Sequence, residues 1–234
     1  AAAAMQPEAA EREYFADFKA NRISLQNFPL ATWTRLMRET LSVHNEELLK
    51  TVPYKGVYEL RKAIAAYLAH NRAMEVDPSQ IIIGAGTEYL YGRLLQMFGH
   101  ACTFAIEEPG YQKFASISAS FGNPWKYIPI DDNGLMIDKL EESGADVVHL
   151  SPANHFPTGI VMPVTRRLEL FEWVNRIRKR YIIEDDYDSE FRYTGRFILP
   201  LYAQDTQSRV IYMNTFSKSL VPSLRISYMV LPPR

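Results

Sequence analysis

Short apolar and β-branched runs alternate with stretches of helical spacing along most of this 234-residue chain. The predicted strands cover 81–83, 103–106, 125–130, 147–150, 181–183, 210–213 and 227–231. Helical spacing covers 31–49 and 57–72 ahead of the first strand, and 88–98, 112–120 and 165–180 between strands. Strands that alternate with helices indicate an α/β fold with a largely parallel sheet of about seven strands.

Charge and cysteine content exclude several classes of protein. The formal net charge of -1 argues against a nucleic-acid or anionic-membrane surface on this segment, because such a surface needs a positive face. The single cysteine, Cys102, excludes an intrachain disulfide and fits a reducing cytoplasm. No apolar run approaches the ~20 residues that cross a bilayer, and no signal pattern opens the chain. We therefore expect a cytoplasmic protein that does not bind membranes.

The loops that follow the predicted strands carry the chemistry. In open α/β sheets, ligands bind outside the carboxyl ends of the strands. Five loops follow those ends: "GAGTE", "EEPGYQKF", "SPANHFPTG", "EDDYDSEF" and "NTFSKSL". We expect them to converge on one crevice that contains a lysine, acids, hydroxyls, glycines and an aromatic ring.

Lys218 and the acidic loop are the residues that indicate what this crevice could bind. Most lysines are solvated surface residues, but Lys218 in a partly desolvated site would form a Schiff base with an aldehyde. The acidic loop has three readings: an acidic turn at a strand end, carboxylates for Mg²⁺, or an Asp185 that keeps the pyridine nitrogen of pyridoxal phosphate protonated. The lysine in the neighbouring loop favours pyridoxal phosphate. Tyr187, two residues further on, is placed to bond the phenolic oxygen of that ring.

Phosphate binding would fall to the loop that opens the helix at 88–98. Backbone N–H groups at a helix N-terminus hold phosphate, but "GAGTE" lacks both a third glycine and a G-K-[ST] sequence. Arg225, with Thr215 and Ser217, could complete a phosphate cup, although an isolated arginine is more often in a surface ion pair. Tyr111 either lies flat on the cofactor ring or is a core tyrosine.

These motifs together resemble a known family. "TFSKSLVPSLR" is similar to the lysine motif of fold-type-I pyridoxal-phosphate enzymes, the aspartate aminotransferase-like family. "IIEDDYDSEFRY", "HFPTGIVMPVTRRLEL" and "YKGVYELRKAIAAYL" resemble the aminotransferase-like domain of MocR-type regulators in the GntR superfamily. The resemblance covers about 25–234.

The resemblance implies an architecture. Residues 1–50 would form an N-terminal arm and helix, and residues 51–234 a three-layer large domain. That domain would have helices on both faces of a mostly parallel, seven-stranded sheet. A small C-terminal domain and any N-terminal winged helix-turn-helix would lie outside this chain. The family further implies a homodimer with its site at the subunit interface.

The resemblance also implies a role for each residue. Lys218 would form the internal aldimine, Asp185 would face the pyridine nitrogen, and Tyr187 the phenolic oxygen. Tyr111 would stack on the ring. The phosphate would be surrounded by Ala85, Gly86, Thr87, Thr215, Ser217 and Arg225.

The loop after the predicted strand 147–150 departs from the aminotransferase pattern. Many such enzymes have Asn-Pro-Thr-Gly there, and the asparagine touches the ring. This chain reads "NHFPTG", with Phe156 at that position, as MocR-type domains do. Asn154 or His155 would substitute, although His155 is more simply a loop histidine bonded to backbone. The remaining histidines show no pairing and no metal-ligand spacing.

Two functions remain open. In the first, the chain is the effector-sensing part of a transcription regulator that binds DNA through a domain outside this chain. An amine or amino acid would displace Lys218 by aldimine exchange and shift an equilibrium that the DNA-binding domain reads. In the second, it is part of a free-standing class I/II aminotransferase. The wording of "EDDYDSEF" and "HFPTG" favours the regulator.

Overall fold

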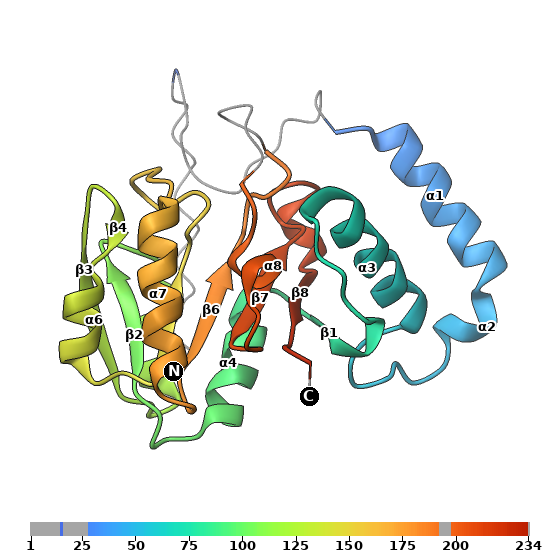
Figure 1. Cartoon of the computed structure of the whole chain (residues 1–234). Coiled ribbons are helices and arrows are strands. Elements are labelled where there is room, and N and C mark those ends of the chain that lie inside the picture. Colours follow the sequence, from blue (N-terminus) through green and yellow to red (C-terminus); the bar gives the residue numbers. More distant parts are fainter. Residues whose placement is uncertain (1–14, 16–27, 192–197, 234) are drawn as a thin grey trace, which may run out of the picture.

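One eight-stranded sheet forms the centre of the chain, in the order β1-β8-β7-β6-β5-β2-β3-β4 (Figure 1). The computed structural model describes residue 15, residues 28–191 and residues 198–233. The strands are β1 (Ile81–Gly84), β2 (Phe104–Glu108), β3 (Trp125–Asp131), β4 (Gly134–Leu135), β5 (Val147–Leu150), β6 (Tyr181–Asp185), β7 (Val210–Thr215) and β8 (Ser227–Val230).

Helices lie before and between these strands. They are α1 (Leu30–Val43), α2 (Asn45–Leu48), α3 (Tyr58–Arg72), α4 (Thr87–Phe98), α5 (Gln112–Ser120), α6 (Ile137–Ser143), α7 (Val164–Arg176) and α8 (Leu201–Gln204). Two short 3-10 helices, η1 (Pro78–Gln80) and η2 (Pro222–Leu224), precede β1 and β8.

Strand direction decides which loops meet. β2, β3, β5, β6 and β7 are parallel to one another, whereas β8 is antiparallel to both β7 and β1. β1 therefore runs in the same direction as β7. The carboxyl ends of β1, β2, β5, β6 and β7 share one edge of the sheet, and β8 begins at that same edge.

The predicted elements are largely confirmed, with several differences. The expected count of about seven strands is wrong by one, because β4 is a two-residue strand antiparallel to β3 and too short to give an apolar pattern. The helix expected at 31–49 breaks at His44 into α1 and α2. The helix expected at 165–180 ends at Arg176, and α6 and α8 were not predicted.

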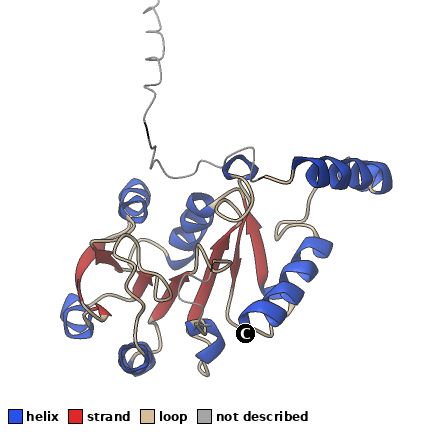
Figure 2. Cartoon of the chain, turned by 90° about the horizontal axis from the view of Figure 1, so that it is seen from above, coloured by secondary structure: helices blue, strands red, loops and turns tan. Residues whose placement is uncertain are grey.

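Side chains that alternate along the strands bury both faces of the sheet. In β6, Ile183 packs with α4 and α5, whereas Ile182 packs with α6 and α7. On the second of these faces, α3 contributes Leu68 to a cluster with Tyr212 of β7. Figure 2 shows the resulting three layers, helices on each side of the central strands. The expected helices on both faces of a mostly parallel sheet are confirmed.

Helix α1 lies outside these layers, and none of its residues is buried. The arm expected at 1–50 falls mostly on residues 1–14 and 16–27, which lie outside the described residues. The division into an arm and a large domain therefore stays a prediction. No helix among the described residues is long and apolar enough to cross a membrane.

Candidate functional site

A cavity of about 270 Å³ opens at the carboxyl ends of the parallel strands. It is lined by Thr87, Glu88, Tyr111, Lys113, Ser151, Phe156, Asp185, Tyr187, Thr215, Ser217, Lys218 and Arg225. These residues come from all five loops that were expected to converge. Arg225 joins them because β8 is reversed, so the residues just before it lie at the same edge.

Eight of the eleven sequence-predicted site residues line this cavity: Thr87, Tyr111, Asp185, Tyr187, Thr215, Ser217, Lys218 and Arg225. The other three do not line it. Ala85 is exposed in the turn before α4, and Gly86 lies against the Arg225 side chain. Asn154 donates from Nδ2 to Asp188 and, at 3.4 Å, to the Tyr187 hydroxyl.

Asp185 is the buried acid of the cavity. It ends β6 and its residue is only 7% exposed. Its Oδ2 accepts a hydrogen bond from the Tyr91 hydroxyl at 2.7 Å. Its Oδ1 is buried and has no hydrogen-bond partner among the described residues. A buried carboxylate oxygen without a partner is costly, so this oxygen fits a donor or a cation held in the cavity.

The residues behind Asp185 were not predicted from sequence. The Tyr91 hydroxyl lies 2.9 Å from Nε2 of His149, and that nitrogen lies 3.7 Å from Asp185 Oδ2. The expectation that His149 has no pairing is therefore wrong. In the sequence, Tyr91 is one apolar-face residue of α4 and His149 lies inside a buried strand. The pairing of β5 with β6 places His149 next to Asp185, and the packing of α4 on this face of the sheet places Tyr91 there.

Hydroxyls and a cation form the opposite end of the cavity. Ser227 Oγ donates to Thr215 Oγ1 at 2.8 Å, and the Thr215 hydroxyl lies 3.0 Å from Ser217 Oγ. Arg225 has left-handed backbone geometry, with φ of 52°. Thr87 begins α4, a helix of 12 residues whose first N–H groups point out of its N-terminus. This end of the cavity suits an anion.

The "NHFPTG" loop presents its phenylalanine to the cavity. Phe156 is 51% exposed and lines the cavity, whereas neither Asn154 nor His155 does. The Tyr187 hydroxyl donates to the backbone oxygen of Asn154 at 3.1 Å. His155 is buried, with Nδ1 2.7 Å from Thr158 Oγ1. The loop thus uses Asn154 to hold Tyr187.

Lys218 lines the cavity but its residue is exposed. The sequence predicted a partly desolvated amine at Lys218. The described residues alone do not provide that burial. Lys113, a second lysine of the cavity wall, forms an ion pair of 2.7 Å with Glu88. Among the described residues, no group of three His, Cys, Asp or Glu side chains that could hold a metal ion is found.

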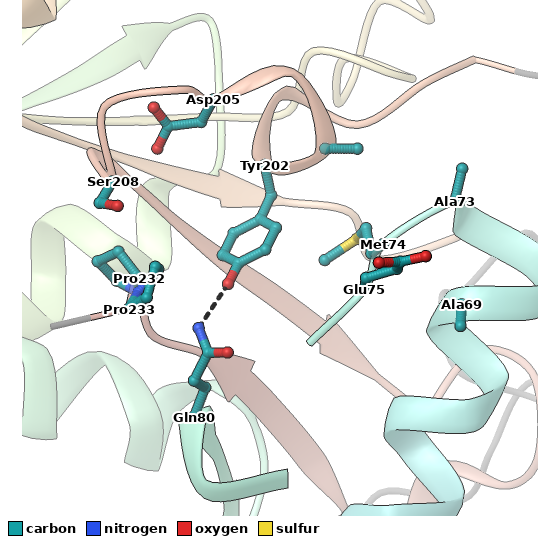
Figure 3. Close-up of a pocket in the computed structure, with 11 residues that line it drawn as sticks. Ala69, Ala73, Met74, Glu75, Gln80, Tyr202, Asp205, Ser208, Pro232 and Pro233 are labelled. Atoms are coloured by element: carbon teal, nitrogen blue, oxygen red, sulfur yellow. Dashed lines mark hydrogen bonds between the residues drawn. The ribbon is translucent and has the colours of Figure 1, made fainter. Parts of the chain in front are cut away.

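A second, larger pocket of about 590 Å³ lies at the other end of the strands (Figure 3). It is bordered by η1, by residues that precede β7 and by Pro232 and Pro233 after β8. Inside it, Gln80 Nε2 donates to the Tyr202 hydroxyl at 2.9 Å. This pocket lacks a lysine or an arginine and is separated from the cavity by the length of the sheet.

Comparison with known proteins places this arrangement in a family. The sequence model of the family described as aminotransferase class I and II matches residues 17–233. The HTH-type transcriptional regulator YdeL of Bacillus subtilis is 40% identical over 97% of this chain and 49% of its own length. The probable rhizopine catabolism regulatory protein MocR of Rhizobium meliloti is 33% identical over 90% of this chain and 43% of its own.

Solved structures of aminotransferases share the fold of this chain. The Pyrococcus horikoshii kynurenine aminotransferase, described in complex with PMP, superposes with a TM-score of 0.79 at 27% identity. It is matched over 88% of this chain and 53% of that one. This chain thus spans about half the length of the curated relatives it matches. On the family match and the shared fold, the chain belongs to the aminotransferase class I and II family.

Proposed function

We propose that this chain binds pyridoxal 5'-phosphate in the cavity at the carboxyl ends of the strands. The observation that carries the proposal is the buried Asp185 Oδ1 without a partner, in the same cavity as Lys218. A protonated pyridine nitrogen is a donor that this oxygen lacks. Membership of the aminotransferase class I and II family, and a neighbour described with PMP, support the choice of cofactor.

The residues present fit the parts of that cofactor. Lys218 would hold its aldehyde carbon, Asp185 its ring nitrogen and Tyr187 its phenolic oxygen. Arg225, Thr215, Ser217 and the start of α4 at Thr87 would hold its phosphate, with Ala85 and Gly86 in the turn behind them. Tyr111, which lines the cavity, would cover the ring. When bound, the cofactor supplies an electron sink for charge at the α-carbon of an amine.

We further propose that the chain is the effector-sensing part of a transcription regulator. The support is its likeness to YdeL and MocR, together with Phe156 in the cavity where an aminotransferase would place asparagine. An amine or amino acid that displaces Lys218 from the cofactor would favour one conformation of the whole protein, which a DNA-binding domain outside this chain would read. Such a protein would act in the cytoplasm and as a homodimer.

The alternative is a class I/II aminotransferase. Its support is the likeness to the kynurenine aminotransferase of Pyrococcus horikoshii. An enzyme completes both half-reactions, whereas a sensor needs only selective binding of an amine. The two functions therefore differ in turnover and in response to DNA.

The cofactor proposal is tested by borohydride reduction of the complete protein with pyridoxal phosphate, followed by peptide mapping. We expect a pyridoxyl group on Lys218, lost in Lys218→Ala and retained in Lys113→Ala. Lys113 is a fair control because it also lines the cavity. Label on Lys113, or none on either lysine, would overturn the assignment.

The regulator proposal is tested by titration of the bound cofactor's absorbance with a panel of amines, alongside a coupled transamination assay and DNA binding. We expect selected amines to change both the absorbance and DNA binding, without sustained turnover. Turnover at ordinary enzyme rates, of order 1–10³ per second, without any change in DNA binding would leave the aminotransferase.

A further inference from the structure

A tyrosine hydroxyl lies between the cavity carboxylate and a buried histidine. The Tyr91 oxygen is 2.7 Å from Asp185 Oδ2 and 2.9 Å from His149 Nε2. Tyr91 is 0% exposed and His149 is 2% exposed. Neither residue lines the cavity. Their polar contact with it runs through Asp185, and both rings also lie beside Tyr111 of the cavity wall, with centroids 6.2 Å and 6.4 Å away.

One hydroxyl proton can serve only one of these two contacts at a time. If Tyr91 donates to Asp185, then His149 must carry its proton on Nε2 and donate to the Tyr91 oxygen. The three groups then form a chain of donors that ends on Asp185 Oδ2. In the opposite arrangement, Asp185 would be a neutral acid that donates to Tyr91, and His149 Nε2 would be an acceptor.

The proposed cofactor requires the first direction, because a protonated ring nitrogen pairs with an ionised carboxylate and only the first direction leaves Asp185 ionised. Burial, followed by the nearby Asp185 carboxylate, raises the pKa of Tyr91 well above its usual value, so the hydroxyl keeps its proton in either direction. Aromatic contacts hold both rings in place. Phe114 stacks on His149, with centroids 4.7 Å apart and planes 15° apart, and meets the Tyr91 ring edge-on at 4.8 Å.

We infer that Tyr91 and His149 are positioning residues that orient Asp185 for the cofactor. Tyr91 occupies Oδ2, so the rotation of the carboxylate is fixed and Oδ1 is the oxygen left for the cavity. His149 holds the Tyr91 hydroxyl in the donating direction. The inference rests on the proposed cofactor, because Oδ1 would face its ring nitrogen.

The chain offers a matched control next to this site. The hydroxyl of Tyr212, also 0% exposed, donates to Asp186 Oδ2 at 2.8 Å and accepts from Asn214 Nδ2 at 3.2 Å. Tyr212 thus makes the same kind of contact with the next carboxylate along the chain. Asp186 does not line the cavity.

The first test compares pyridoxal phosphate affinity of the complete protein carrying Tyr91→Phe or Tyr212→Phe. Each change removes one buried hydroxyl and keeps the ring. We expect Tyr91→Phe to weaken cofactor binding about 10-fold, since it removes a hydrogen bond to an ionised group. Tyr212→Phe should leave affinity within about 2-fold. Equal affinity of Tyr91→Phe and wild type would overturn the inference while leaving the proposed function intact.

The second test needs no cofactor. Long-range proton–nitrogen NMR of the protein with ¹⁵N-labelled histidine reports which nitrogen of His149 carries the proton. We expect Nε2–H in wild type, with a changed Nε2 shift in Tyr91→Phe and none in Tyr212→Phe. An unprotonated His149 Nε2 in wild type would mean that the hydrogen bonds run in the opposite direction, and it would overturn the inference. Absence of cofactor binding in wild type would instead refute the proposed function, and this measurement would still report the Tyr91–His149 contact.

Discussion

The guanidinium of Arg225 occupies the space that a side chain at Gly86 would need. A Cβ built on Gly86 would lie 2.3 Å from Arg225 Nη2. Gly86 also has φ of 97° and ψ of 164°, a conformation open essentially to glycine alone. Glycine is therefore required at position 86 for two reasons: the backbone conformation and the close approach of the Arg225 side chain.

Gly86→Ala should weaken binding of pyridoxal phosphate roughly 10-fold, because Arg225 would be displaced from the anion end of the cavity. Gly99→Ala is the matched control. Gly99 ends the same helix with φ of 78° and ψ of 169°, but nothing lies within 4 Å of its Cβ position. Both variants should lose ~1–3 kcal/mol of stability to backbone strain. Cofactor titration and urea unfolding measure the two effects, and an equal loss of affinity in both variants would contradict the role of Arg225.

Asp185→Asn should weaken cofactor binding by ~1.5–3 kcal/mol, the typical contribution of a hydrogen bond to a charged group. An asparagine whose oxygen accepts from Tyr91 would point its NH₂ into the cavity, and a protonated ring nitrogen would then meet a donor. Affinity is measured by equilibrium dialysis, with urea unfolding as the check on folding. Unchanged affinity in a stably folded variant would exclude Asp185 as the partner of the ring nitrogen.

Arg72→Met should destabilise the fold by ~3–5 kcal/mol, because it leaves the Asp186 carboxylate buried without its ion-pair partner. The side chains of this pair are 7% and 1% exposed. In Arg35→Met, the lost pair with Glu39 has side chains that are 62% and 54% exposed, and the change should be below ~0.5 kcal/mol. Urea unfolding gives both values. An equal loss of unfolding free energy in the two variants would contradict a stabilising role of Arg72 for the buried Asp186 carboxylate.

Glu107 should make the fold less stable as pH rises. Burial raises the pKa of Glu107 from its usual 4.5 to about 8, so the folded chain keeps a proton that the unfolded chain releases between these values. The free energy of unfolding therefore falls across this window, by up to ~1.4 kcal/mol per pH unit from this group.

Glu107→Gln removes that contribution, because an amide does not titrate between pH 5 and pH 8. Its oxygen can still accept the Ser151 N–H, which donates to Glu107 Oε2 at 3.1 Å in the wild type. The stability of Glu107→Gln minus that of wild type should increase from pH 5 to pH 8, as measured by urea unfolding. Glu184, whose pKa burial raises to about 7, titrates in both proteins and cancels in the difference. A difference that stays flat with pH would show that Glu107 is ionised throughout.

Local patterns in the chain were sufficient to predict the α/β class and every strand longer than two residues. Apolar runs such as 147–150 and 210–213 have lengths and compositions that depend little on distant contacts. The five loops at the strand ends were predictable for the same reason, since a parallel sheet brings carboxyl ends to one edge. Strand ends alone therefore suffice to assign Lys218 and Asp185 to one site.

Other features depended on pairings that no local pattern encodes. The reversal of β8 places Arg225 at the cavity edge, strand order places His149 behind Asp185, and the packing of α4 on the sheet places Tyr91 there. A buried polar group is usually hydrogen-bonded, often to a residue far away in the sequence. The spacing between two such residues follows no helix or strand period. Tyr91 and Asp185 are 94 residues apart. Apolar periodicity assigns such residues only to the core, and the packed sheet and helices determine which of them reach the site.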